Sequence, residues 1–261
     1  MNLDYFHKDD SFYSALKRFF EDLNVPFNNI TEESIAPGVI LSKLFSIKNE
    51  AHLLIDDVFI LGLVDDAAFR GEAGIAPDSI KKRNDDYDGI MVFGVTLKKR
   101  AKGLLPSKTH LSEITRAFNR EYLAIPVMVV FKYDGLLAFA NAERLKYKHK
   151  GKPGEKTGKV TILRDVDPEK THTAHIKILN ELMIDRRKIT SFAQLYDYWR
   201  KVFSLQSLNN NFYEDLQEWF YFATQRIKLP YKPDYIDEKE NIKNFLVRLI
   251  ARTLFCWFVK E

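Results

Sequence analysis

The sequence has little cysteine and no long uninterrupted apolar run. Cys256 is the only cysteine, so no disulfide can form within the chain, which fits a reducing compartment. The most apolar stretch, 245–259, contains Arg248 and Arg252, whereas a membrane-spanning helix needs about 20 apolar residues with few charges. The first residues also lack the basic and then apolar pattern of a signal peptide. We therefore predict a cytoplasmic protein with no membrane association.

An excess of charge of one sign is also missing. The chain has 40 Lys and Arg residues against 36 Asp and Glu residues, a formal net charge of +4. A balance this small does not by itself indicate nucleic-acid binding, so the placement of the charges has to decide. Hydrophobic residues make up 46% of the chain and aromatic residues 13%, which is enough for a folded core and excludes disorder over most of the sequence.

Several sequence motifs of enzymes are absent. The chain has no Walker-type phosphate loop, no Rossmann glycine fingerprint and no nucleophile elbow. It also lacks the tetrapeptide of adenine methyltransferases, which is Asn or Asp followed by two prolines and an aromatic residue. We therefore expect neither ATP hydrolysis nor methyl transfer from this chain.

The pattern of apolar residues changes near Pro168. Two helices are expected near the start, one from Asp10, its cap, to about Leu23, and a short one from Thr31 that Pro37-Gly38 interrupts. Farther along, β-branched and aromatic runs alternate with an amphipathic helix, and Asp134-Gly135 is a strong hairpin turn signal. The expected elements there are a strand at 89–97, a helix at 111–122, a strand at 126–131 and its hairpin partner at 136–142. After Pro168 the spacing is helical throughout. We predict a mixed-sheet α/β domain over 1–168 and an all-helical domain over 169–261, with the protein continuing beyond Glu261 because the last helix lacks a capping glycine.

One set of residues has the composition of a nuclease active site. Many metal-dependent nucleases place an aspartate on one strand and a second acid, two residues before a lysine, on the next. The two carboxylates hold Mg²⁺ and the lysine acts on the attacking water. Lys98 fits the lysine, Asp88 or Asp65 fits the aspartate, and Thr96 stands where the second acid is expected. The alternative is an ordinary solvated strand end.

Basic residues gather in two places. In the expected helix, Glu113, Arg116 and Arg120 lie at i, i+3 and i+7 on one face, which would meet phosphates or would be an ion-paired solvent face. The window 144–159 is rich in lysine and glycine, and a flexible lysine loop can follow a phosphate backbone. The lysines of this window that we assign to DNA binding are Lys146, Lys148 and Lys150.

Two further patterns favour structural roles. His172 and His175 are spaced so that they can share a metal, but no third ligand is evident, so Thr171 or Thr173 capping a helix is the better interpretation. Aromatic residues at helical spacing can stack on bases but are far more often core. The aromatic residues concerned are Phe212, Tyr213, Trp219 and Phe220, and Leu216 and Ala223 continue the same apolar spacing.

The second half of the chain resembles a known family. The segments that carry the resemblance are 111–120, 126–133, 139–144, 159–166, 171–176, 209–216 with Trp219, and 248–261. In this order they resemble the N-terminal region of bacterial type IIG restriction–modification proteins, which join a nuclease-like front to an adenine-specific, S-adenosylmethionine-dependent DNA methyltransferase. The first hundred residues resemble it poorly.

The resemblance implies a restriction-endonuclease-like α/β front followed by a helical connector. It implies double-stranded DNA and a C-terminal methyltransferase of the same polypeptide as partners, with S-adenosylmethionine bound only in that later part. Lys98 matches the nuclease lysine and Asp88 its aspartate, with Asp88 as ligand of Mg²⁺. Thr96 departs from the expected acid, and Glu113 would have to replace it.

The leading hypothesis is thus a DNA-handling module of a restriction–modification enzyme, with Mg²⁺-dependent cleavage if its degenerate site is active. The alternative is a non-enzymatic scaffold within a larger DNA methyltransferase, and RNA binding is a third option. Convergence of Lys98, Arg116, Arg120 and the lysine window on one face near Asp88 would favour the enzyme. Scattered positions would favour the scaffold.

Overall fold

The computed structural model divides the chain into two compact units, Met1–Ser204 and Leu205–Glu261. The residues that the structure describes are 3–8, 11–29, 33–41, 50–83, 85–146, 155–203, 205–230 and 237–260. The division falls later in the chain than the expected boundary at 168, because the helices that directly follow the sheet are part of the first unit. The α/β class and the mixed sheet predicted from the sequence are confirmed.

The first unit contains one six-stranded sheet whose spatial order, β1-β2-β3-β4-β5-β6, is also the order of the strands along the chain. β3 and β4 are parallel, and all other neighbours are antiparallel. The strands are β1 (Asn28–Asn29), β2 (Ile55–Asp65), β3 (Gly89–Leu97), β4 (Val127–Tyr133), β5 (Leu136–Lys146) and β6 (Glu155–Val166). The strand expected over 89–97 is confirmed at both ends.

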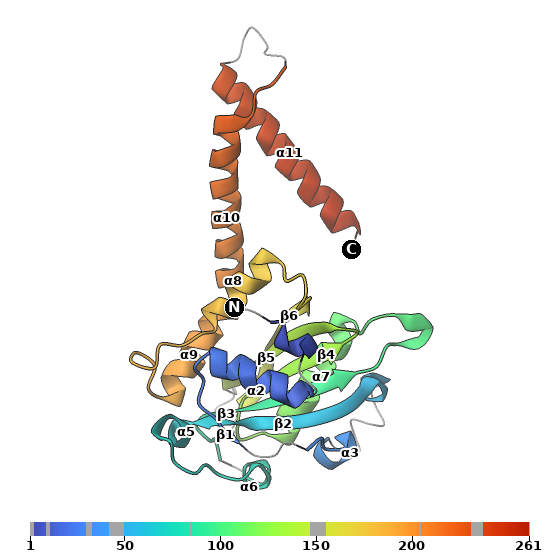
Figure 1. The fold of residues 1–261 in the computed structure, drawn as a ribbon, viewed down its shortest axis with the longest axis vertical. Coiled ribbons are helices and arrows are strands. Elements are labelled where there is room, and N and C mark those ends of the chain that lie inside the picture. Colours follow the sequence, from blue (N-terminus) through green and yellow to red (C-terminus); the bar gives the residue numbers. More distant parts are fainter. Residues whose placement is uncertain are drawn as a thin grey trace. The chain divides into compact units, whose positions relative to one another are not determined.

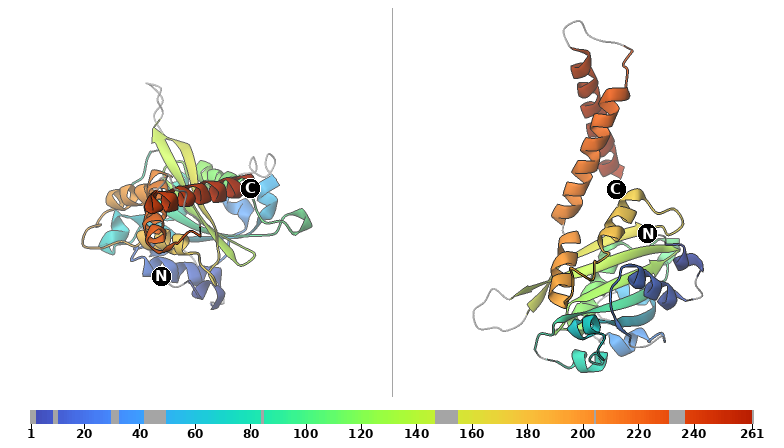
Figure 2. Two further views of the ribbon diagram at one scale, coloured as in Figure 1. Left: turned by 90° about the horizontal axis from the view of Figure 1, so that it is seen from above. Right: turned by 60° about the vertical axis from the view of Figure 1, so that its left-hand side comes forward.

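Helices cover both faces of this sheet, as Figures 1 and 2 show. The helices of the first unit are α1 (Tyr5–Lys8), α2 (Phe12–Asp22), α3 (Pro37–Ile40), α5 (Asp66–Arg70), α6 (Pro77–Lys81), α7 (Lys108–Glu121), α8 (Thr173–Glu181) and α9 (Phe192–Val202), with short 3₁₀ turns η1 (Glu50–Leu54) and η2 (Ala101–Gly103). Successive side chains of a strand point to opposite faces. In β3, Val92 packs on the α2 side and Phe93 on the α7 side. Burial on both faces explains why β3 is a continuous apolar run.

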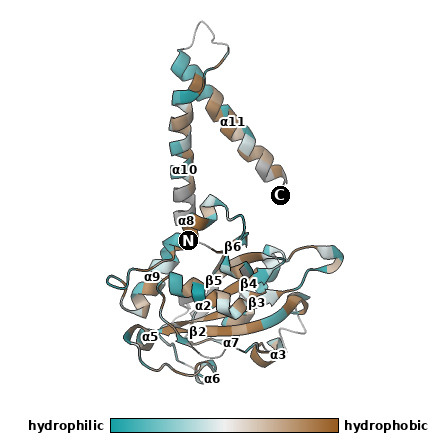
Figure 3. Ribbon diagram, in the orientation of Figure 1, coloured by the Kyte–Doolittle hydropathy of each residue, from teal (hydrophilic) through white to brown (hydrophobic). Residues whose placement is uncertain are grey.

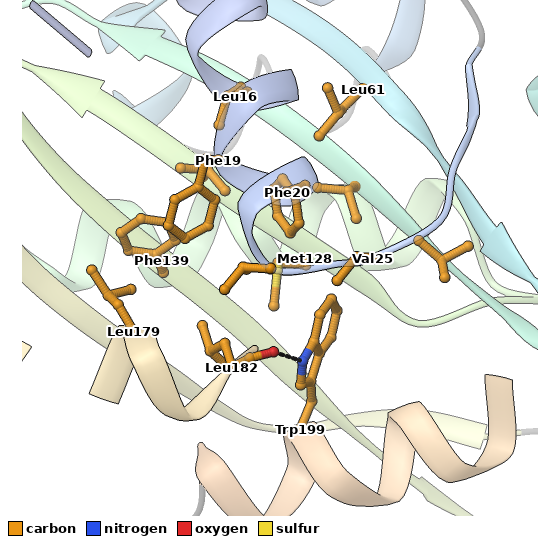
Figure 4. Packing of buried hydrophobic residues seen from close by; sticks show 14 of the residues in the cluster. Leu16, Phe19, Phe20, Val25, Leu61, Met128, Phe139, Leu179, Leu182 and Trp199 are labelled. Atoms are coloured by element: carbon orange, nitrogen blue, oxygen red, sulfur yellow. Dashed lines mark hydrogen bonds between the residues drawn. The ribbon is translucent and has the colours of Figure 1, made fainter. Parts of the chain in front are cut away.

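The core on the α2 side joins both ends of the first unit (Figure 4). Phe19 contacts Phe139 of β5 with ring centroids 5.1 Å apart, and Phe20 contacts Trp199 of α9 at 6.4 Å. The Trp199 indole N–H donates to the Leu182 carbonyl at 3.1 Å, so its polar edge is satisfied inside the core. Figure 3 shows the central strands mainly in brown, as expected for a sheet enclosed by helices.

Local capping differs from the sequence prediction at three places. Ser11, not Asp10, caps α2 by accepting from the Ser14 N–H, and Asp10 lies outside the described residues. His172 caps α8 in place of a threonine, with its Nδ1 accepting from the Ala174 N–H at 3.4 Å. Pro37 begins α3 rather than interrupting a helix, because proline at the first helical turn loses no hydrogen bond.

The second unit contains two long helices, α10 (Leu205–Arg226) and α11 (Glu238–Lys260). Its buried core consists of Ala223, Ile242 and Leu246 within the described residues. The set predicted to be core is only partly so: Ala223 is buried and Phe220 packs against it, whereas Phe212 is 47% exposed, Tyr213 64% and Trp219 45%. The helical spacing was correct, but the helices do not cover these side chains.

In the described part of the chain, the helices are all too short or too polar to cross a membrane.

Gly62 allows β1 to approach β2. A Cβ atom at Gly62 would lie 2.8 Å from the Asn28 backbone oxygen and 2.7 Å from Phe27 Cδ1. We expect Gly62→Ala to lower the free energy of unfolding by about 1–3 kcal/mol, because the backbone of β1 has to shift. Gly38→Ala is the matched control, since nothing lies within 4 Å of a Cβ atom there. Urea unfolding of both variants checks this, and equal midpoints would contradict it.

Candidate nucleic-acid interface

The exposed side of α7 is cationic. Ser107 caps the helix within a capping box that His110 completes, and Leu111, Ile114 and Phe118 bury one face against the sheet. The residues of α7 that remain exposed are Lys108, Thr109, Arg116 and Arg120.

No ion pair joins Lys108, Arg116 or Arg120 to another described residue. With a rise of about 1.5 Å per residue, the three cations extend over roughly 18 Å along the helix. We refer to Lys108, Arg116 and Arg120 as the α7 stripe. Both arginines assigned to DNA from the sequence belong to the α7 stripe. Lys108 also belongs to it, and sequence reasoning missed this residue because it precedes Leu111, where the expected helix begins.

Lys98 lies at the opposite end of β3 from Asp88. Asp88 directly precedes β3 and Lys98 directly follows it, so the strand holds them roughly 30 Å apart at about 3.3 Å per residue. No single metal site can contain both. The active site predicted from Asp88 and Lys98 is therefore incompatible with the fold, because the two residues flank one strand instead of lying on two neighbouring strands.

The residues that do surround Lys98 come from the start of β2. Because β2 and β3 are antiparallel with Ile55 opposite Leu97, Asp56 and Asp57 lie beside the end of β3. Lys98 Nζ is 3.0 Å from Asp56 Oδ1, and the Asp57 N–H donates to Thr96 Oγ1 at 3.0 Å. The Lys98 and Asp56 side chains are 59% and 51% exposed, so this ion pair adds little to stability.

Asp65, the other candidate aspartate, has a structural role. It is 1% exposed, and its carboxylate accepts three hydrogen bonds. Oδ1 accepts from Asn28 Nδ2 at 3.0 Å and from the Ala68 N–H at 2.8 Å, and Oδ2 accepts from the Tyr87 hydroxyl at 2.6 Å. Burial, together with the bond to Asp65, raises the pKa of Tyr87 above its usual range. With these donors in place, Asp65 has no role as a metal ligand.

Asp88 borders a cavity of about 480 Å³ whose lining carries net negative charge. Asp86, Asp88 and Asp197 line it together with a single cation, Arg200, which is 3.3 Å from Asp197. Such a lining repels phosphate. This cavity is thus unsuited to a DNA backbone.

The remaining predicted residues do not join Asp88 or Lys98. Glu113 is half-buried on α7, and neither a hydrogen bond nor an ion pair connects it to either residue. Lys148 and Lys150 lie outside the described residues. Lys146 ends β5, which runs antiparallel to β4, so it lies toward the end of the sheet where β3 and β4 begin, on the side of Asp88 and away from Lys98. The described members of the predicted set are therefore divided between the two ends of the sheet and do not gather at one site.

Among the described residues, no group of three or more His, Cys, Asp and Glu side chains is arranged to hold a metal ion. The ligands that Mg²⁺ prefers are oxygens in octahedral arrangement, with at least one or two carboxylates. Near Lys98 one carboxylate is engaged by the lysine, and the Thr96 hydroxyl takes the place of another. The described side chains around Lys98 therefore form no such group.

No family model matches the chain, and no curated protein or solved structure matches it either.

A matched pair of substitutions separates the two aspartates. Asp65→Asn should lower the free energy of unfolding by about 3 kcal/mol, because an amide nitrogen would replace a buried oxygen that accepts hydrogen bonds. Asp88→Asn is the same chemical change at an exposed position and should alter the free energy by less than about 0.5 kcal/mol. Thermal unfolding checks both, and a stable Asp65→Asn protein would contradict the structural role.

Proposed function

We propose that this chain is the DNA-handling front module of a restriction–modification protein and that it positions DNA without cutting it. The single observation that carries this proposal is the α7 stripe, in which three cations without a described ion-pair partner lie along one exposed helix side. Cations in such a row neutralise successive phosphates and release condensed counterions, which is the main source of sequence-independent DNA affinity.

The α7 stripe is suited to the DNA backbone rather than to base recognition. Two of its members are arginines, whose guanidinium groups can donate two parallel hydrogen bonds to one phosphate. Thr109, the other exposed α7 residue, adds a hydroxyl that can also donate to phosphate. The stripe lies on a helix held rigidly by the sheet, so contacts with DNA would fix its orientation relative to the rest of the protein.

The proposed loss of cleavage is based on the residues that surround Lys98. The proposed restriction-endonuclease-like ancestry places an acid at position 96, and this chain has Thr96 there. Lys98 pairs with Asp56 instead of facing a metal ion and its water. In this proposal an adenine-specific methyltransferase, which would bind S-adenosylmethionine, is a partner supplied by another part of the same polypeptide.

A non-enzymatic scaffold is the second candidate function. Its support is the set of exposed apolar side chains on α10 and α11, which includes Trp219 at 45% and Phe255 at 68% exposure. The scattered positions of Lys98, Lys146 and the α7 stripe also suit this candidate. The two candidates differ in whether the isolated chain binds DNA.

A gel-shift series on double-stranded DNA at several salt concentrations tests the DNA proposal. We expect Arg116→Ala/Arg120→Ala to weaken binding by about tenfold or more at low salt and to reduce the salt slope by about two, since each phosphate contact contributes roughly 0.9. Arg200→Ala/Lys201→Ala removes two exposed cations from α9 and should bind like the wild type. Equal binding by all three proteins would contradict a DNA surface on α7.

Nicking of supercoiled plasmid tests the loss of cleavage. With Mg²⁺ or Mn²⁺ we expect no nicking by the wild type and no difference in Lys98→Ala, because the metal ligands are incomplete. Nicking that Lys98→Ala abolishes would overturn this part of the proposal. The absence of both nicking and DNA binding would leave the scaffold candidate.

A further inference from the structure

The α10–α11 pair leaves two apolar stripes partly uncovered. In α10, Phe212, Leu216, Trp219 and Ala223 follow one another at steps of four, three and four residues, which keeps them on one side of a helix. Ala223 is buried, whereas Trp219 and Phe212 on the same stripe are 45% and 47% exposed. The stripe is covered near one end of the helix pair and open along the rest.

The second helix shows the same pattern. In α11, Ile242, Leu246 and Leu249 are spaced by four and three residues. Ile242 and Leu246 are buried against α10, but Leu249 is 41% exposed. Figure 1 shows why: the two helices meet where α10 ends and α11 begins, and they diverge from there. Apolar side chains of both helices beyond this contact are exposed, and another helical surface can cover them.

The charges on the two helices differ in sign. α10 contains three acids, Glu214, Asp215 and Glu218, and one cation, Arg226, which stacks on the Phe222 ring at 4.2 Å. After Glu240, α11 contains no acid and four cations, Lys243, Arg248, Arg252 and Lys260. A partner that covers both stripes therefore has to present cations to α10 and acids to α11. A second copy of the same helix pair has both.

The spacing of the charges fits such a partner. Glu214 and Glu218 are four residues apart on α10, and Arg248 and Arg252 are four residues apart on α11, so each pair is separated by about 6 Å along its helix. Two helices packed side by side can thus match both ion pairs at once. All four side chains are exposed, and none forms an ion pair with another described residue.

A surface groove on α10 is suited to the arginines. A cavity of about 290 Å³ is lined by Glu214, Gln217, Glu218 and Tyr221. Two carboxylates and a tyrosine ring together suit a guanidinium group, which pairs with the former and stacks on the latter. The cations of α11 are the groups on this chain that would enter it from a second copy.

We propose that two copies of this chain associate through their second units, with α10 of each copy packed against α11 of the other. Glu214 and Glu218 of one copy pair with Arg248 and Arg252 of its partner, and the open stripes around Trp219 and Leu249 are buried between them. The contact is the same on both copies, so it closes into a symmetric dimer of four helices and does not polymerise.

Charge-swap variants of the whole chain test the dimer by light scattering and sedimentation equilibrium, with 30.5 kDa as the monomer mass. We expect the wild type to be dimeric at micromolar concentration. Arg248→Glu/Arg252→Glu should weaken the dimer about tenfold or more, and so should Glu214→Arg/Glu218→Arg, because each swap places like charges opposite one another in both symmetric contacts.

A mixture of the two swap variants is the decisive sample. One variant is then acidic at every position and the other basic, so a mixed dimer has opposite charges in both contacts and should form with near wild-type affinity. Arg116→Glu/Arg120→Glu reverses two charges in the first unit and should leave the dimer intact. A monomeric wild type, large polydisperse aggregates, or swap variants that fail to associate when mixed would each overturn the proposal, and a monomer would indicate a different partner for the stripes.

Discussion

Parallel strands β3 and β4 cannot be joined by a tight turn, and the connection that joins them determines most of the first unit. The chain has to return across one face of the sheet, and α7 is the element that does so. The apolar side of α7 packs against the sheet, so the orientation of the helix on the sheet determines which of its residues face solvent. Three of those residues, Lys108, Arg116 and Arg120, are cations, and their spacing in the sequence places them along one side of the helix.

Much of the fold could be predicted from the sequence because the relevant signals are local. The apolar run of β3, the Asp134-Gly135 turn with φ of 48° and 79°, and the amphipathic pattern of α7 each specify a structure over a few residues. The candidate site could not be predicted in the same way. Its geometry depends on which end of β2 lies beside which end of β3, and the antiparallel register puts Asp56, not Asp88, next to Lys98.

The sequence also did not reveal which side chains are buried. Asp65 and Asp88 are similar in sequence context, since each lies at an end of a strand, yet one accepts three hydrogen bonds inside the protein and the other is exposed at the border of a cavity. The aromatic residues of α10 illustrate the converse. A stripe at helical spacing indicates that a surface exists, but it has the same spacing whether the surface is covered by the same chain or by another molecule.

The α2 core has a consequence for the order of events during synthesis. The strands lie in the sheet in the same order in which they leave the ribosome, since spatial and chain order coincide. The apolar side of α2 is made at the start, but Phe20 packs against Trp199, which is made far later. At about 5–20 residues per second the delay is roughly 10–40 s. During that interval Phe20 lacks its contact with Trp199, so the α2 side of the core is complete only after α9 has been made.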